Sequence, residues 1–209
     1  MNETTAIKLP QQAQAPVEED APRLLRITAE QFEKMHYANV FTYPNGRVVL
    51  REGQICLMNA QHIPHVTVKA EVYEALLDGL RGLGVNLRLA SEGSVRANDH
   101  NVPQPDIIVW DPLRARCAVP RERVRLAVEI TDTTHAEDLG YKRALYAAAG
   151  IPEYWIVDLR ARIIRQNWAP ISGAYASAQA VAFGDAVESV AIPGLAISTA
   201  PLQDLDFGE

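Results

Sequence analysis

Two acidic residues and one lysine stand out because of where they lie relative to predicted strands. Asp106 opens the apolar run 107–110, Glu129 lies within the predicted strand 124–131, and Lys142 follows on the next predicted helix. Carboxylates at the start of one strand and near the end of its neighbour can meet at one edge of a sheet. Such oxygens suit Mg²⁺, which keeps several waters that a phosphate can replace. A bound metal delivers hydroxide near neutral pH, and a lysine beside it would orient the water or stabilise the charge on the phosphate.

Simpler structural interpretations exist for the same residues. Lys142 could form a surface ion pair with Asp138, a contact of little energetic weight. However, Lys142 shares a helical stripe with Leu145 and Ala149, which are expected to pack on the sheet. Burying Glu129 unpaired would cost roughly several kcal/mol, so it requires a metal, a cation or water.

The elements that must position these residues follow from periodicity and from start and stop signals. Thr28 and Gln31 have the spacing of a capping box, Gly53 is a natural turn residue, and four-residue spacing from Val68 to Leu80 predicts an amphipathic helix. In chain order, the predicted elements are a helix from Thr28 to about Tyr37, strands 48–50 and 55–57, a helix at 65–81, strands 85–90, 94–96, 106–110 and 124–131, a helix at 137–149, and strands 154–157 and 161–168.

The order of these elements predicts a mixed α/β (α+β) fold, with a central mixed β-sheet flanked by helices, rather than a helical bundle. Strand 106–110 is apolar after Asp106 and is expected to be buried on both faces, whereas 124–131 alternates and is expected to have two distinct faces. The last two predicted strands form a hairpin around Asp158. The segment from Gly173 onward carries only weak strand signals.

Composition limits the class of protein. The chain has 209 residues, of which 48% are hydrophobic, so it can bury a core without staples. Residues 1–22 are rich in Gln, Ala, Pro and acids and are expected to be a disordered or loosely attached tail before one domain at 23–209. Apolar runs too short for a membrane helix, no secretory signal and two distant cysteines favour a cytoplasmic protein without a disulfide framework.

The charge distribution leaves open whether the protein binds nucleic acid. The formal net charge is −6, but sixteen of the twenty basic residues are arginines, which suit phosphate better than lysines do. A run between 114 and 125 contains Arg121, Arg123 and Arg125, which are candidate DNA contacts. The alternative is that these arginines are solvated or paired with acids.

One long ordered pattern resembles a known family. The segments 127–134 (AVEITDTT) and 149–158 (AGIPEYWIVD), with Asp138, Lys142 and 145–146 between them, resemble the signature of the Uma-two family of restriction-endonuclease-like proteins in the PD-(D/E)XK nuclease superfamily. The similarity continues upstream through 105–109 (PDIIV), the Glu52-Gly53 turn and His65. It spans roughly residues 28–200.

The resemblance implies a restriction-endonuclease-like core and a magnesium site, with Mn²⁺ as a substitute. It assigns Asp106 and Glu129 as metal ligands and as catalytic residues. Thr131 stands where the superfamily carries its lysine, and Lys142 matches the helical lysine that replaces it in this family. Glu52 matches an acidic position near the site of some relatives.

Two further residues are expected to support the site. His65, at the head of a helix, is a candidate second-sphere residue or phosphate contact, and a partly buried structural histidine is the alternative. Asp132 stands where relatives often carry serine; it is an additional ligand candidate or a helix cap.

The sequence is consistent with three functions. The first is a metal-dependent endonuclease that hydrolyses phosphodiester bonds in DNA, for which double-strand cleavage favours a two-fold homodimer. The second is a catalytically silent protein of the same fold that binds nucleic acid or protein partners. The third is a plain α/β interaction domain whose acids pair with its arginines.

Overall fold

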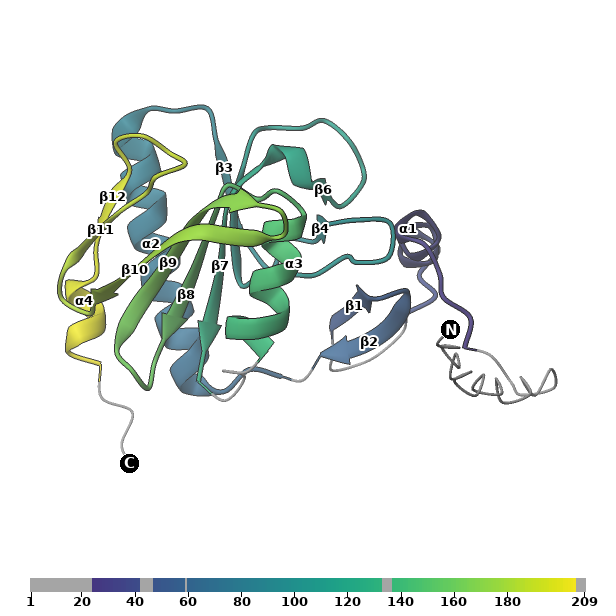
Figure 1. Ribbon diagram of the computed structural model, residues 1–209, viewed down its shortest axis with the longest axis horizontal. Helices are drawn as coiled ribbons and strands as arrows, with labels where there is room; N and C mark the ends of the chain where they lie inside the picture. Colours follow the sequence, from purple (N-terminus) through teal and green to yellow (C-terminus); the bar gives the residue numbers. More distant parts are fainter. Residues whose placement is uncertain (1–23, 42–46, 59, 133–136, 206–209) are drawn as a thin grey trace, which may run out of the picture.

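The computed structural model describes residues 24–41, 47–58, 60–132 and 137–205 (Figure 1). A six-stranded mixed sheet forms its centre. In spatial order, the strands are β10 (Ala174–Ala182), β9 (Ile163–Ile171), β8 (Glu153–Asp158), β7 (Val124–Thr131), β5 (Ile107–Trp110) and β3 (Arg88–Ser91). Only β7 and β8 are parallel, and all other neighbours are antiparallel.

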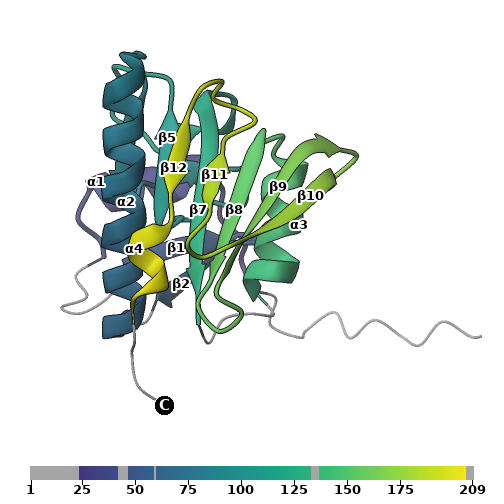
Figure 2. The ribbon, with the colours of Figure 1, turned by 90° about the vertical axis from the view of Figure 1, so that its left-hand side faces the viewer.

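Helices cover both faces of this sheet. Helix α2 (Ile63–Leu83) lies on one face, and α3 (Arg143–Ala148) lies on the other (Figure 2). The two helices are held by different residues of the same strands, because successive strand residues point to opposite faces. On β7, Leu126, Val128 and Ile130 pack in the cluster of α2, whereas Ala127 packs in the cluster of α3.

The predicted stripe of α2 is confirmed. Val68, Val72, Leu76 and Leu80 are all buried against the sheet. Gly84 ends the helix in the left-handed conformation, with φ of 64°, as is usual for a C-terminal glycine.

Smaller elements lie on the two sides of the sheet (Figure 1). The hairpin of β11 (Ala186–Glu188) and β12 (Ala196–Ser198) and the helix α4 (Ala200–Gln203) pack on the side of α2. Helix α1 (Ala29–Tyr37) and the hairpin of β1 (Arg47–Arg51) and β2 (Gln54–Met58) lie on the side of α3. The remaining elements are the parallel pair β4 (Val95–Arg96) and β6 (Val119–Pro120), the 3₁₀ turn η1 (Arg121–Arg123) and the π-helical segment η2 (Glu137–Lys142).

Local sequence signals in the first half of the chain are confirmed. The Gln31 amide donates to Thr28 Oγ1 at 3.2 Å, and the Thr28 amide donates to Gln31 Oε1 at 2.8 Å, which completes the capping box. Gly53 turns the β1–β2 hairpin with φ of 78°, and an added Cβ would lie 2.7 Å from Cβ of Arg26. Glycine is therefore required there both by the backbone and by the close approach of Arg26.

Several predictions differ from the structure. Strand β7 is buried on both faces except at Arg125, because α2 and α3 cover the two sides. The helix expected at 137–149 begins as the π-helical η2 and becomes α-helical only at Arg143. The segment from Gly173 onward, which carries only weak strand signals, forms β10, the β11–β12 hairpin and α4. The expected tail, 1–22, lies outside the described residues.

In the described part of the chain, the length and hydropathy required of a membrane-spanning helix are not met by any helix.

Candidate active site

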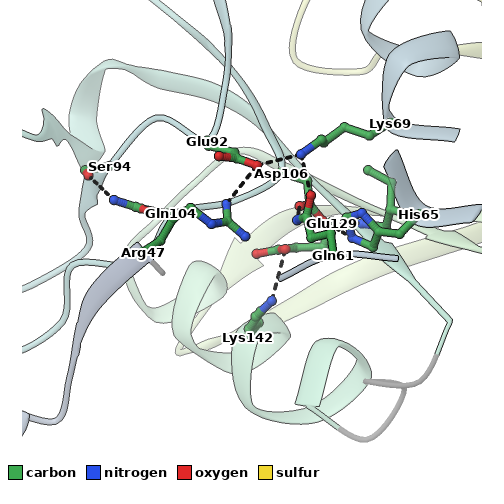
Figure 3. Close-up of polar contacts among 11 residues, drawn as sticks. Arg47, Gln61, His65, Lys69, Glu92, Ser94, Gln104, Asp106, Glu129 and Lys142 are labelled. Carbon is green, nitrogen blue, oxygen red and sulfur yellow. Dashed lines mark hydrogen bonds and ion pairs between the residues drawn. The ribbon is translucent and has the colours of Figure 1, made fainter. Parts of the chain in front are cut away.

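Asp106, Glu129 and Lys142 line one cavity of about 430 Å³. Its wall also contains residues of β1, of β2 and of the segment that leads into α2. Figure 3 shows the two carboxylates at its centre, with Lys142 approaching from η2 and His65 from α2. Segments that are far apart in the sequence therefore supply one polar site.

The pairing of β5 with β7 brings the two acids together. The antiparallel register places Ile107 opposite Val128, so the next step brings Asp106 beside Glu129. Side chains directly opposite in such a pair lie on the same face of the sheet. In addition, the amide of Ile130 donates to Asp106 Oδ2 at 2.9 Å, which ties the start of one strand to the end of the other.

The Asp106 carboxylate is held by three donors. Besides the Ile130 amide, Nε2 of His65 lies 3.1 Å from Oδ2, and Nε2 of Gln61 donates to Oδ1 at 2.6 Å. Burial alone would raise the pKa of Asp106, but the hydrogen bond and charge of His65, the Ile130 amide and the charge of Lys142 lower it below its ordinary value. Asp106 is therefore a buried carboxylate that is ionised at neutral pH.

The Glu129 carboxylate contacts two residues that follow it along the chain. Nζ of Lys142 lies 3.0 Å from Oε2, and the Tyr146 hydroxyl donates to Oε1 at 2.8 Å. The amine of Lys142 therefore points toward the sheet, as its place on the predicted helical stripe indicates. Glu129 is 2% exposed, and the Lys142 side chain is 16% exposed. Lys142 is thus an inward-facing lysine rather than a solvated surface residue.

The π-helical segment η2 is fixed to the β1–β2 hairpin. Arg51 of β1 lies over the Tyr141 ring, 4.0 Å from its centroid, and contacts Oε1 of Glu137 at 3.0 Å. The Tyr141 hydroxyl donates to Asn101 Oδ1, which also accepts from the backbone amide of Glu52. Short π-helical segments are frequent at functional sites, and this one ends at Lys142.

Of the remaining predicted residues, some line the cavity and others do not. Asp132 lines the cavity and contacts Arg160 at 3.3 Å, and His65 lines it through its contact with Asp106. Glu52 has φ of 50° in the hairpin turn, is exposed and is not among the residues that line the cavity. Thr131 is fully buried at the end of β7.

The predicted arginines are not brought to this cavity. Arg121 and Arg123 lie in η1, and Arg125 is the exposed second residue of β7, roughly 13 Å along the strand from Glu129 at about 3.3 Å per residue. Arg121 pairs with Glu122, and Arg125 pairs with Asp111. The arginines that line the cavity are instead Arg47 and Arg51 of β1.

Sequence reasoning missed four residues around the acids. Tyr146 contacts Glu129, and Gln61, Lys69 and Glu92 form a linked group beside Asp106 (Figure 3). A weak signal existed for Lys69, which follows His65 by one helical turn beside the buried stripe of α2. No signal in the sequence links Gln61 to Asp106.

The donor chemistry fits a hydrated divalent cation. No group of three or more His, Cys, Asp and Glu side chains able to hold a metal occurs among the described residues. Mg²⁺ takes one or two protein carboxylates and keeps water in its other positions. Asp106 and Glu129 would supply those carboxylates, and the ionised state of Asp106 suits this role.

Comparison with a solved structure shows which fold this chain resembles. The chain is similar to the crystal structure of a "putative nuclease belonging to DUF820" from Anabaena variabilis, with a TM-score of 0.60 and 17% identity over 84% of this chain and 97% of the other. The fold is therefore nuclease-like, with a mixed sheet flanked by helices.

The sequence identifies the family. Residues 29–200 match the profile of the Uma2 family, described as "Putative restriction endonuclease". The chain belongs to this family, as the sequence resemblance predicts. No curated protein matches it.

Proposed function

We propose that this protein is a metal-dependent endonuclease that hydrolyses phosphodiester bonds in DNA. The observation that carries the proposal is one cavity lined by an ionised Asp106, the buried Glu129 and the inward-facing Lys142. When bound, Mg²⁺ or Mn²⁺ supplies charge neutralisation and a water of lowered pKa. Asp106 and Glu129 would hold the cation.

Each remaining contact has a part in this chemistry. The ammonium of Lys142, beside Glu129 Oε2, can donate to a phosphate oxygen or to the attacking water. The Tyr146 hydroxyl holds Glu129 in place, and His65 and the Ile130 amide do the same for Asp106. Arg51, partly exposed at the cavity, is suited to bind the DNA backbone.

Cleavage of supercoiled plasmid with Mg²⁺ and with Mn²⁺ tests the proposal. Wild type is expected to nick or cut the plasmid, and Glu129→Gln is expected to abolish cleavage and weaken metal binding in calorimetry. Glu129→Gln keeps an acceptor for Tyr146, so the fold should be retained. Glu74→Gln, an exposed glutamate on α2, is the matched control and should cleave like wild type. Cleavage by Glu129→Gln at the wild-type rate would reject the assignment.

A catalytically silent nuclease fold is the second candidate. It is favoured by one observation, the buried Thr131 where the superfamily carries its lysine. A protein that binds metal and DNA but cleaves neither plasmid nor single-stranded DNA would support this candidate instead.

We also propose that the active form is a two-fold homodimer, because double-strand cleavage favours two sites related by the two-fold symmetry of the duplex. Sedimentation of the protein with and without duplex DNA tests this. A monomer in both conditions that still makes double-strand cuts would contradict it.

A further inference from the structure

Behind Asp106 lies a group of polar side chains that the proposed reaction does not use. Nζ of Lys69 lies 2.6 Å from Oε1 of Glu92 and also donates to Oε1 of Gln61. Gln61 in turn donates to Oδ1 of Asp106 at 2.6 Å. Figure 3 shows Lys69 reaching from α2 toward Glu92 and Gln61, beside Asp106.

Lys69 is held firmly at its own end of this chain. Its side chain is only 12% exposed, which is unusual for lysine and requires a charged partner. That partner, Glu92, is fixed a second time by Nη1 of Arg47 at 3.2 Å. The backbone of Glu92 has φ of 58°, and its amide donates to the carbonyl of Asp106 at 3.0 Å. Glu92 therefore anchors Lys69 beside the residue that Gln61 contacts.

The two neighbours of Gln61 allow only one orientation of its amide. Lys69 is an ammonium and can only donate, so it must face the carbonyl oxygen of Gln61. At the other end, the Gln61 NH₂ group donates to the carboxylate oxygen Oδ1 of Asp106 at 2.6 Å. A glutamine with one cation and one anion at its two ends cannot rotate by half a turn without placing like groups against each other.

From this geometry we infer that Lys69 is a positioning residue that acts through Gln61 on the metal ligand Asp106. The inference rests on the proposed function. Hydrogen-bond partners of metal ligands fix ligand orientation, and their loss typically lowers metal affinity or activity by about 10- to 100-fold. Lys69 is one contact further away and touches neither substrate nor metal, so its effect must pass through the Gln61 amide.

A double-mutant cycle separates this role from a simple charge effect. Gln61→Leu is expected to weaken the binding of Mn²⁺ and Mg²⁺, measured by calorimetry, by about tenfold or more. Lys69→Met should weaken it to a similar extent, and it should cause no further loss in the Gln61→Leu background. If Lys69 acted only through its charge, removing a cation near the site would strengthen metal binding. Stronger binding, or an equal change in both backgrounds, would overturn the inference.

Two controls protect the interpretation. Lys34→Met removes an exposed lysine that pairs with Glu30 on α1, and it should leave metal affinity unchanged. If Lys69→Met does not fold, Glu92→Gln, which loosens the anchor of Lys69, should weaken metal binding in the wild-type background and cause no further loss in the Gln61→Leu background, whereas the loss of its charge alone would weaken binding equally in both. No effect of Glu92→Gln would then count against the inference.

A measurement without metal distinguishes this inference from the proposed function. In ¹⁵N spectra, the side-chain NH₂ of Gln61, identified by its absence in Gln61→Leu, should exchange slowly in wild type. It should exchange faster in Lys69→Met and as slowly as in wild type in Lys34→Met. If wild type binds no metal but this pattern is observed, the proposed function fails and the positioning contact stands. Unchanged exchange in Lys69→Met would show that Lys69 does not hold the Gln61 amide, and would overturn the inference.

Discussion

The backbone amide of Ile130 donates to Oδ2 of Asp106 at 2.9 Å, so the residue that follows one buried acid hydrogen-bonds the other. This contact orients the Asp106 carboxylate from β7, the strand that carries Glu129. The two acids are therefore placed by a single feature, the antiparallel pairing of β5 with β7. A one-residue shift of either strand would turn its acid to the opposite face and separate the two carboxylates, because strand residues alternate between faces.

Lys142→Met is expected to slow cleavage by about 10²- to 10³-fold, because an amine aimed at developing charge is lost. Metal affinity should be retained or slightly raised, since a cation that competes for Glu129 is removed. Single-turnover cleavage and calorimetry on the same samples check both expectations. A variant that loses metal binding together with activity would show that Lys142 mainly maintains the site's structure.

The stability of the protein should depend on Asp106 at acidic pH. Its pKa is lowered in the folded state from an ordinary value of 3.8, so the folded protein releases this proton more readily than the unfolded chain does. The resulting stabilisation is present above pH 3.8 and is lost as the pH falls through the lowered pKa.

Urea unfolding at pH 7 and pH 3 measures this dependence. The difference in the free energy of unfolding between the two pH values should be larger for wild type than for Asp106→Asn. Asp78→Asn, at an exposed position of α2, controls for the loss of an ordinary carboxylate. Identical pH dependence in wild type and Asp106→Asn would show that this carboxylate contributes nothing.

Substitution of two arginines distinguishes DNA binding at the cavity from DNA binding at the arginine run. Arg51 lines the cavity, whereas Arg125 lies at the other end of β7. Arg51→Gln should weaken binding to a catalytically inactive background and reduce the slope of log K against log salt by about one. Arg125→Gln should change neither quantity. Fluorescence anisotropy over a range of salt concentrations checks this, and the reverse result would favour the arginine run as the DNA contact.

Returning the lysine to the strand should not restore the site. Thr131 is fully buried, so Thr131→Lys would force an ammonium into the interior at a cost of roughly several kcal/mol. The double variant Thr131→Lys/Lys142→Met is expected to melt well below wild type and to remain inactive. Wild-type activity in that double variant would show that the strand position is equivalent to the helical one.

The sequence predicts those parts of the fold that rest on local patterns. The capping box at Thr28 and the stripe from Val68 to Leu80 are set by neighbours within one helix, so spacing alone identifies them. Asp106 and Glu129 are also visible in the sequence, because charged residues within apolar strands require a partner.

Other features depend on contacts that spacing does not encode. In the sequence, Lys69 looks like any polar residue beside an apolar stripe. Its role depends on its contact with Glu92, which lies far from it in the chain. Strand β10 is rich in alanine, which has low strand propensity, and it forms because it pairs along β9. The composition of the arginine run does not reveal that Arg125 is paired with Asp111.

The placement of Lys142 on η2, rather than at the Thr131 position of the same strand, has a consequence for assembly. A lysine on β7 would stand two residues from Glu129 as soon as the strand formed. The amine of Lys142 reaches Glu129 only when η2 is packed against the sheet. The charged pair therefore depends on tertiary packing, and a chain in which η2 is displaced would carry both acids without the amine that the proposed reaction uses.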